Sequence, residues 1–448
     1  MIDRCMPDFE IMKLWRDPVP RNKLPFHTRL ESLSMQGYAL DDQKKCGVYG
    51  ALQGEQVLAV PLRKKKKIWL CRAEQIQSPS SDRVEPGCQY ANICGGCSWQ
   101  HLSRQGQLNL KEAWLRELFA DITPRQWLKP LSGEGAGYRS KARLGVRFVA
   151  KKEKTLVGFR EKANSFIADV SRCDILAPPL DNLLEPLSEL IDLFAEPALI
   201  PQIEVAAGDE GAALVVRHLA KLSEKDLLAL AEFADRYQVL IFLQPGGSDS
   251  VALFAPQGAE ALLSYSLKDQ HLKFLFHPLD FTQVNQPINQ LMVNQALDLL
   301  DLHGKDRVLD GFCGIGNFSL PIAQEAAFVT GLEGSESAVS RAQNNASLND
   351  VNNIEFKYCD LYGTQLPQIG DGSYNKALMD PPRSGAEGFC KVLAASEVER
   401  VVYVSCNPKT LVRDAEILIS GGFDFNNMGM IDMFPHTTHL EIITLFTR

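Results

Sequence analysis

Short stretches that alternate apolar and polar side chains dominate the chain between residues 23 and 80. These stretches are residues 28–33, 47–52, 57–62 and 67–74, and glycine or polar residues separate them. A period of two is typical of half-buried strands, and several short strands joined by turns predict a small all-β barrel. Residues 1–22 show no clear period, so we expect a poorly ordered arm there.

The middle of the chain, residues 81–270, mixes helical and strand-like periods. Apolar spacing predicts a helix over residues 108–119 and strands over residues 202–207 and 239–243. No catalytic signal accompanies these elements beyond a cysteine-rich segment and a basic one. We therefore expect a central α/β or α+β domain.

Residues 271–448 alternate strand-like and helical segments after a helix predicted over residues 288–300. This alternation predicts an open, mostly parallel α/β sheet, and ligands of such sheets bind beyond the carboxyl ends of the strands. The predicted strands are residues 307–310, 328–333, 376–379 and 401–404, with a further one ending near residue 360. The polar residues at the ends of four of these five strands are Glu333, Asp360, Asp380 and Cys406.

The strand over residues 307–310 runs into the turn Gly311-Phe312-Cys313-Gly314-Ile315-Gly316-Asn317-Phe318. A glycine-rich turn between a strand and a helix lets a nucleotide-like ligand approach the backbone. Glu333 ends the next strand, where an acidic side chain can bind ribose hydroxyls. Together they predict a crevice for a nucleoside-containing ligand.

The composition fits two or three globular domains, since 45% of the 448 residues are hydrophobic. No apolar run reaches the roughly 18 residues of a membrane span, and the first residues do not resemble a signal peptide. Eleven cysteines, an odd and unevenly spread number, argue against a disulfide framework. We therefore expect a cytoplasmic protein in a reducing compartment.

Charge is distributed unequally along the chain. Residues 1–170 carry 29 Lys and Arg against 18 Asp and Glu, whereas residues 171–448 carry 18 against 37. A basic front half suggests an anionic partner such as nucleic acid, although chance unevenness of solvated faces gives the same numbers. The run from Arg63 to Lys67, with Lys64 and Lys65, is expected on a hairpin tip, as phosphate contacts or as a solubilising loop.

A second basic segment lies at residues 137–148. If it is a strand, its basic side chains share one face and its apolar side chains the other, with Tyr138 available for stacking on a base. A solvated strand face explains the pattern equally well. The basic residues are Arg139, Lys141, Arg143 and Arg147.

Cys88, Cys94 and Cys97 follow the spacing C-x5-C-x2-C, with Gly95 and Gly96 between the last two. Glycines let the backbone wrap tightly around a metal centre, and Cys173 is the nearest candidate for a fourth thiolate. Spacing alone leaves zinc and an iron–sulfur cluster open. His101 is expected to be a packing or capping residue.

Cys406 follows four apolar residues, Val401 to Val404, in the sequence Val-Ser-Cys-Asn-Pro. Most cysteines are small buried hydrophobes. Here the thiol follows a strand beside a predicted ligand crevice, so a substrate could reach it.

The C-terminal motifs resemble those of class I S-adenosylmethionine (SAM) methyltransferases. The glycine-rich turn, Asp380-Pro381-Pro382-Arg383, Val-Ser-Cys406-Asn-Pro and His439-Leu440-Glu441 are similar in particular to the RNA (uracil-C5)-methyltransferase family. The cysteine spacing and the N-terminal barrel resemble its iron–sulfur branch.

This resemblance implies a fold of three parts: an OB-like TRAM barrel over residues 23–80 that binds RNA, a central domain over residues 81–270, and a SAM-dependent methyltransferase domain over residues 271–448. It implies a [4Fe–4S] cluster on Cys88, Cys94, Cys97 and Cys173. The side chains that it implies around SAM are Gln283, Phe312, Asn317, Glu333, Asp360 and Asp380. It also implies formation of 5-methyluridine in 23S rRNA, free or partly assembled, by a monomer.

The implied chemistry explains why a thiol and a carboxylate are needed. Uracil C5 is a weak nucleophile until a thiolate adds at C6, and Cys406 matches that nucleophile. Such a thiol is expected to have a lowered pKa. Glu441 matches the general base that removes the C5 proton, and the target base is expected to leave its stack.

Other functions fit less well. Amino-methyltransferases use Asp-Pro-Pro-Tyr, where this chain has Arg383, and the RNA cytosine-C5 enzymes carry a Pro-Cys after the fourth strand that is absent here. The same chemistry on another rRNA site or on tRNA stays open. A catalytically inactive iron–sulfur RNA-binding protein would leave Cys406 and Glu441 unused.

Overall fold

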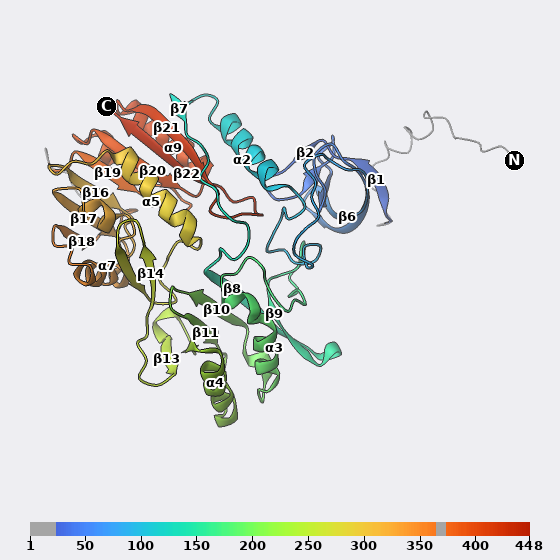
Figure 1. Ribbon diagram of the computed structural model, residues 1–448. Coiled ribbons are helices and arrows are strands. Elements are labelled where there is room, and N and C mark those ends of the chain that lie inside the picture. The colour runs from blue at the N-terminus through green and yellow to red at the C-terminus, as the bar shows by residue number, and fades with distance from the viewer. Residues whose placement is uncertain (1–23, 364–372) are drawn as a thin grey trace, which may run out of the picture. The chain divides into compact units, whose positions relative to one another are not determined.

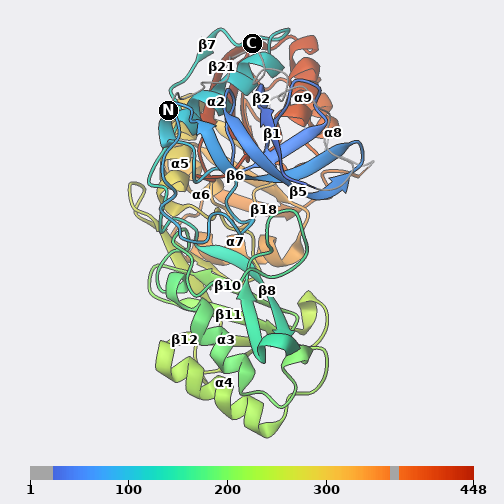
Figure 2. The same cartoon turned by 90° about the vertical axis from the view of Figure 1, so that its right-hand side faces the viewer.

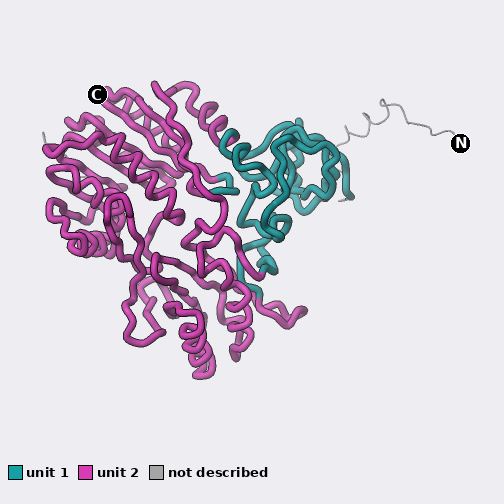
Figure 3. Tube along the Cα trace, in the orientation of Figure 1, with its two compact units in different colours: residues 1–109, 156–170, 435–438 teal, residues 110–155, 171–434, 439–448 magenta. Residues whose placement is uncertain are grey.

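The computed structural model describes residues 24–363 and 373–448. The chain forms two compact units, coloured separately in Figure 3. Unit 1 comprises Met1–Asn109, Leu156–Val170 and Pro435–Thr438, and unit 2 comprises Leu110–Thr155, Ser171–Phe434 and His439–Arg448. The arm expected over residues 1–22 lies outside the described residues.

Unit 1 contains a six-stranded sheet in the order β1-β5-β6-β4-β3-β2, whose strands curve around one another in Figures 1 and 2. The prediction of an N-terminal β domain is confirmed. Inward-facing Val57, Ala59 and Leu70 are at most 1% exposed, which explains the alternating pattern. The strands are β1 (Phe26–Arg29), β2 (Ser32–Leu33), β3 (Ala39–Leu40), β4 (Cys46–Tyr49), β5 (Gln56–Lys65) and β6 (Ile68–Ser78).

The basic run lies at the hairpin between β5 and β6, as expected. Its first three residues, Arg63 to Lys65, still belong to β5, and Lys66 turns the chain with a positive φ of 54°. Lys64 and Lys65 are exposed.

Unit 2 holds most of a six-stranded sheet in the order β13-β12-β11-β10-β8-β9. The strands predicted over residues 202–207 and 239–243 are confirmed as β10 and β12. The elements are β8 (Lys141–Val149), β9 (Lys154–Gly158), β10 (Gln202–Ala207), β11 (Ala212–Arg217), β12 (Val239–Gln244), β13 (Ala252–Ala255), α3 (Leu184–Asp192) and α4 (Glu224–Tyr237).

An eight-stranded sheet in the order β18-β17-β16-β19-β20-β22-β21-β7 forms the other large part of unit 2. Strands β16 to β20 pair in parallel, and β22 runs antiparallel to both β20 and β21. The predicted parallel sheet is therefore confirmed. The strands are β7 (Gln126–Trp127), β16 (Arg307–Gly311), β17 (Phe328–Glu333), β18 (Ile354–Tyr358), β19 (Lys376–Met379), β20 (Arg400–Ser405), β21 (Asp424–Ile431) and β22 (Glu441–Thr447).

Helices and a hairpin complete the layers around this sheet (Figure 1). Helix α5 packs on β19, β20 and β22, α7 packs on β17, β18 and the hairpin β14–β15, and α9 packs on β21 and β22. The helices predicted over residues 108–119 and 288–300 are confirmed as α2 and α5. The elements are α2 (Arg104–Leu118), α5 (Gln286–Leu300), α6 (Ser319–Ala323), α7 (Glu336–Leu348), α8 (Glu387–Ala394), α9 (Pro408–Ser420), β14 (Leu263–Leu267) and β15 (Leu272–Phe276).

The central strand β20 is fully buried from Val401 to Val404, as a four-residue apolar run predicts for a parallel strand covered on both faces. A buried ion pair lies elsewhere in unit 2. Nζ of Lys111 lies 2.7 Å from Oδ1 of Asp432 and 3.3 Å from the backbone oxygen of Phe434, and both charged side chains are 0% exposed. No helix within the described residues is long and apolar enough to cross a membrane.

Candidate active site

The pairing of β20 with β22 brings the predicted nucleophile and the predicted base together. Ser405 is paired with Ile442 in this antiparallel ladder. Cys406 directly follows β20, and Glu441 is the residue before Ile442, so both lie at the same end of the ladder. Cys406 is half-buried, whereas Glu441 is only 4% exposed.

Asp380 lies beside this pair at the end of β19. Its Oδ2 accepts a hydrogen bond of 3.2 Å from Nε2 of Gln283, so two residues predicted to hold SAM are in contact. Burial raises the pKa of Asp380 to about 7. Burial, followed by the charge of Asp380, raises the pKa of Glu441 well above its usual range. Two neighbouring carboxyl groups with raised pKa values are typical of a catalytic site.

The thiol of Cys406 is less acidic than an ordinary cysteine. Burial, and then the charges of Glu441 and Asp380, raise its pKa from 9.0 to about 11, while Arg383 opposes them. The expectation of a lowered pKa is therefore wrong for the ligand-free protein. Two carboxylates near one thiol disfavour a third negative charge.

Arg383 is a cation close enough to this acidic group to affect the pKa of Cys406. Its Nη2 donates to Nδ1 of His439 at 3.1 Å. Burial, and then the charge of Arg383, lower the pKa of His439 to about 4, so the imidazole is neutral and can accept this hydrogen bond. The charge of Arg383 also lowers the pKa of Glu441.

The glycine-rich turn after β16 forms a cradle of backbone. A Cβ at Gly311 would lie 2.6 Å from the ring of Phe389, and Gly316 has a φ of +94°. Oε2 of Glu333, at the end of β17, accepts a 3.0 Å hydrogen bond from the backbone N–H of Gly314. Phe312 also adopts a positive φ of 63°, which is uncommon for a residue with a side chain.

Asp310 lies in β16 just before the glycine-rich turn, and its hydrogen bonding is incomplete. Ser319 donates to its Oδ2, but its Oδ1 is buried and has no partner in the part of the chain that the structure describes. Burial, together with the charges of Asp380 and Glu333, raises the pKa of Asp310 to about 8, against the opposing hydrogen bond from Ser319. A buried acceptor without a partner is suited to a ligand donor.

Asn317 is placed in the turn, but its side chain is occupied by the protein. Its Oδ1 accepts from the hydroxyl of Tyr265 and from Nδ2 of Asn289, both at 2.9 Å. Its Nδ2 donates in return to Oδ1 of Asn289 at 2.9 Å. Asn317 therefore holds the turn against α5 and β14, and its backbone is better placed than its amide for a ligand contact.

Asp360 follows β18, and its Oδ1 accepts from the backbone N–H of Tyr362 at 3.0 Å. The ring of Tyr362 lies 5.6 Å from the ring of Phe312. The residues predicted around SAM thus lie along the carboxyl edge of one sheet, as the strand pattern predicts.

The predicted cluster cysteines divide between the two units. Burial raises the pKa of Cys97 to about 11, and the charges of Cys94 and Cys88 contribute to this shift, so the three thiols of unit 1 are neighbours. Cys173 belongs to unit 2. Within residues 24–363 and 373–448, no group of three or more candidate ligands is arranged to hold a metal ion. His101 is 5% exposed, as expected for a packing residue.

Strand β8 shows only part of the predicted division into a basic face and an apolar face. Arg143 and Arg147 are exposed on β8 and Ala142 is buried, but Phe148 is 37% exposed. Tyr138 is 4% exposed, so the predicted role in stacking is wrong.

Two further candidates for RNA binding are engaged within unit 2. Lys141 donates to the backbone oxygen of Asp280, and burial lowers its pKa to about 8. Nε of Arg139, which precedes β8, donates to the backbone oxygen of Lys141 at 2.9 Å.

Sequence reasoning missed several residues of this site. Asp310 could have been found, because it is an acidic residue at a strand end before a glycine-rich turn. No local signal marks Tyr265 or Asn289, since hydrogen bonds to Asn317 from distant segments define their roles.

The sheet order, the glycine-rich turn and the acidic strand ends define the C-terminal part of unit 2 as a SAM methyltransferase-like fold. The structure resembles the tRNA (uracil-54, C5)-methyltransferase of Pyrococcus abyssi in complex with S-adenosyl-L-homocysteine, with a TM-score of 0.73 and 22% identity over 94% of this chain and 100% of that chain. The family model described as tRNA (Uracil-5-)-methyltransferase matches residues 260–448.

Relatives extend the similarity over nearly the whole chain. Proteins of Hahella chejuensis and Nitrosococcus oceani are 44% and 45% identical over 96% of this chain, covering 99% and 97% of their own lengths. Both are named 23S rRNA (uracil(1939)-C(5))-methyltransferase RlmD. The chain belongs to this RNA (uracil-C5)-methyltransferase family.

Proposed function

We propose that this protein transfers a methyl group from SAM to C5 of a uridine in 23S rRNA, at the position that corresponds to uracil 1939 in the names of its relatives. The observation that carries the proposal is the position of Cys406 and Glu441 at one end of the β20–β22 ladder, beside Asp380. A thiol and a carboxylate are the two groups that C5 methylation of uracil requires.

The residues around the glycine-rich turn fit SAM. Gly314 has a φ of +54° and open space at its Cβ position, so a ligand can approach the backbone there, and Oδ1 of Asp310 is a buried acceptor ready for a ligand donor. The residues that would hold SAM are Gln283, Phe312, Asn317, Glu333, Asp360 and Asp380. SAM, when bound, supplies the methyl group, and its positive sulfonium favours ionisation of the nearby carboxyl and thiol groups.

Cys406 and Glu441 perform the proton and bond changes. The thiol of Cys406 releases its proton to solvent, and its sulfur adds to C6 of uracil, which places negative charge on C5 and its neighbouring carbonyl. After C5 carries the methyl group, ionised Glu441 removes the C5 proton and the bond between C6 and sulfur breaks. The raised pKa of Glu441 makes it a stronger base for this step.

Arg383 favours the charged forms of both groups. Its charge lowers the pKa values of Cys406 and Glu441, against the effect of burial. The neutral ring of His439 accepts its hydrogen bond and fixes its position without adding a second charge.

A [4Fe–4S] cluster on Cys88, Cys94, Cys97 and Cys173 is part of the proposal, with a structural role. Tight wrapping supports it, since a Cβ on Gly95 would lie 2.9 Å from the backbone oxygen of Arg160. The positive charge of Lys162 beside the three thiols of unit 1 also suits a thiolate-rich centre. Anaerobically purified protein without iron and acid-labile sulfide would exclude the cluster.

RNA binding is proposed for the barrel of residues 23–80, with Lys64 and Lys65, and for exposed Arg143 and Arg147 on the central domain. We further propose that the enzyme acts as a cytoplasmic monomer on free or partly assembled 23S rRNA. These assignments follow from the charge asymmetry and the family.

RNA that carries 5-fluorouridine at the target position tests the chemistry. Fluorine cannot leave as a proton, so a covalent adduct should accumulate with SAM and should be lost in Cys406→Ala. Adduct formation by Cys406→Ala would refute the role of the thiol. Methylation of a tRNA transcript in preference to the 23S rRNA fragment would favour the alternative substrate, and absence of both reactions would indicate an inactive RNA-binding protein.

A further inference from the structure

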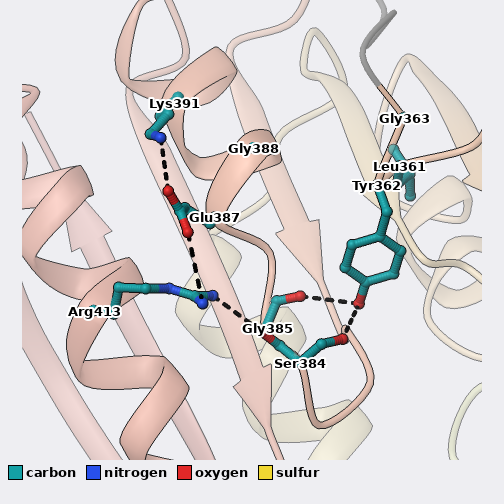
Figure 4. A pocket seen from close by; sticks show the side chains of 9 residues that line it. All are labelled: Leu361, Tyr362, Gly363, Ser384, Gly385, Glu387, Gly388, Lys391 and Arg413. Atoms are coloured by element: carbon teal, nitrogen blue, oxygen red, sulfur yellow. Dashed lines mark hydrogen bonds and ion pairs between the residues drawn. The ribbon is translucent and has the colours of Figure 1, made fainter.

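A pocket of about 300 Å³ lies at the carboxyl edge of the sheet, and none of the groups assigned above to SAM or to the reaction lines it. Its walls come from the loop after β18, from the strip after Arg383, and from α8 and α9 (Figure 4). The side chains that matter most are Tyr362, Ser384, Glu387, Lys391 and Arg413.

The pocket shares a wall with the proposed catalytic site. Nδ2 of Asn407, the residue after the nucleophile, donates to the backbone oxygen of Arg383 at 2.8 Å. Arg383 faces His439, and the next residue, Ser384, lines the pocket. Residues 383 and 384 therefore connect the pocket to the proposed catalytic site.

The buried carboxylate of Asp414 fixes the position of the Arg413 guanidinium. Its Nε and Nη2 lie 2.8 Å and 2.7 Å from Oδ1 of Asp414, and Nη2 also donates to the backbone oxygen of Ser384 at 3.1 Å. Asp414 is 0% exposed and accepts from Tyr403 and from the backbone of Ala386. Nη1 lies 3.7 Å from Oε2 of Glu387. A guanidinium fixed in this way is preorganised to bind a phosphate.

Tyr362 offers a fixed aromatic surface. Its hydroxyl donates to the backbone oxygen of Gly385 at 2.9 Å and accepts from Ser384 at 2.8 Å, as Figure 4 shows. The side of its ring is not sealed, since the residue is 53% exposed. Exposed aromatic rings beside cations are typical stacking sites for unpaired bases.

Glu387 currently neutralises the pocket. It lies 2.7 Å from Nζ of Lys391, one helical turn away, and this pair is solvent-exposed. Exposed pairs of this kind contribute little to stability, so a phosphate can replace the carboxylate at modest cost.

We propose that this pocket binds the nucleotide next to the target uridine, with its phosphate at Arg413 and Lys391 and its base against Tyr362. The proposal rests on the proposed function, because it assigns a second subsite for the same RNA. Its occupant is a nucleotide of single-stranded RNA. The two cations bind its phosphate, and its base stacks on the ring of Tyr362.

The test measures methylation of a 23S rRNA fragment in three forms: unmodified, or with one neutral methylphosphonate linkage on the 5′ or the 3′ side of the target uridine. Lys391→Gln should raise KM for the unmodified RNA about tenfold, the effect of one charge-assisted contact, and leave KM for SAM unchanged. One of the two neutral linkages should raise KM for the wild type and have a smaller effect in Lys391→Gln, in which Arg413 alone remains to bind the phosphate. The salt dependence of log K should flatten by about 0.7 in the variant.

Control variants distinguish an effect of this pocket from the effect of removing any surface charge. Lys273→Gln removes another exposed cation, which lies 3.6 Å from Glu210, and should change none of these values. Arg413→Lys keeps a charge over buried Asp414 and should raise KM for RNA, whereas Tyr362→Phe should retain more affinity than Tyr362→Ala. Glu387→Gln should lower KM for RNA, because it removes a competing anion.

Several results would overturn the assignment. The first is that the neutral linkage raises KM for RNA by the same factor in the wild type and in Lys391→Gln. The others are a change in KM for SAM in Lys391→Gln and a higher KM for RNA in Glu387→Gln. If wild-type protein does not methylate the unmodified fragment, the proposed function fails. In that case, fluorescence anisotropy of the same three fragments with wild type and Lys391→Gln still decides whether the pocket binds RNA.

Discussion

Replacing Glu441 by glutamine should make the thiol of Cys406 more acidic. In the ligand-free protein the pKa of Cys406 is about 11, against 9.0 for an ordinary cysteine, and Glu441 is the largest charge that raises it. At pH 8 a thiol with a pKa of 11 is about 0.1% thiolate, whereas an unperturbed one is about 10% thiolate. Since the thiolate is the reactive form, Cys406 should be alkylated about a hundredfold more slowly than an ordinary cysteine.

Alkylation by iodoacetamide from pH 7 to pH 11, followed by peptide mass spectrometry, measures this directly. The Glu441→Gln profile should move to lower pH, and its rate should rise tenfold for each pKa unit lost. Cys359 serves as an internal control, because burial and then Asp360, not Glu441, raise its pKa. SAM should move the wild-type profile in the same direction more than S-adenosylhomocysteine, which lacks the sulfonium charge.

A wild-type profile with a midpoint below about 8.5, or identical profiles for wild type and Glu441→Gln, would refute this account of the site. The first result would mean that the thiol is activated before ligands bind. The second would mean that Glu441 does not act electrostatically on Cys406.

Three further outcomes follow from the site and the core. Tyr265→Phe removes a hydrogen bond to Asn317 and should raise KM for SAM more than it lowers kcat. The free energy of unfolding should fall by about 1 kcal/mol. Unchanged SAM affinity in calorimetry would contradict this. Lys111→Met leaves Asp432 charged and buried, so urea unfolding should show a loss of about 3–5 kcal/mol, which a second change of Asp432→Leu should partly restore. SAM affinity should fall as pH drops below about 7, because protonation of Asp380 removes a negative charge, and Asp380→Asn should abolish this dependence.

The sequence by itself determined where the chemistry lies along the chain. Short, mostly apolar segments marked β17, β19 and β20, and parallel strands place their carboxyl ends at one edge. Glu333, Asp380 and Cys406 could therefore be assigned to one crevice from local pattern. Pairing Glu441 with Cys406 came from the resemblance, and the register of β20 and β22 explains it.

Only the tertiary structure decided the electrostatic state and the free surface of these residues. The raised pKa of Cys406 depends on Glu441 and Asp380, which reach it from other strands, and no local pattern records such a charge. Tyr138 is buried for the same kind of reason, since periodicity specifies the face of a strand and not what covers it. Long-range contacts set desolvation and Coulomb interactions, so the chain order specifies the catalytic groups while the fold sets their protonation.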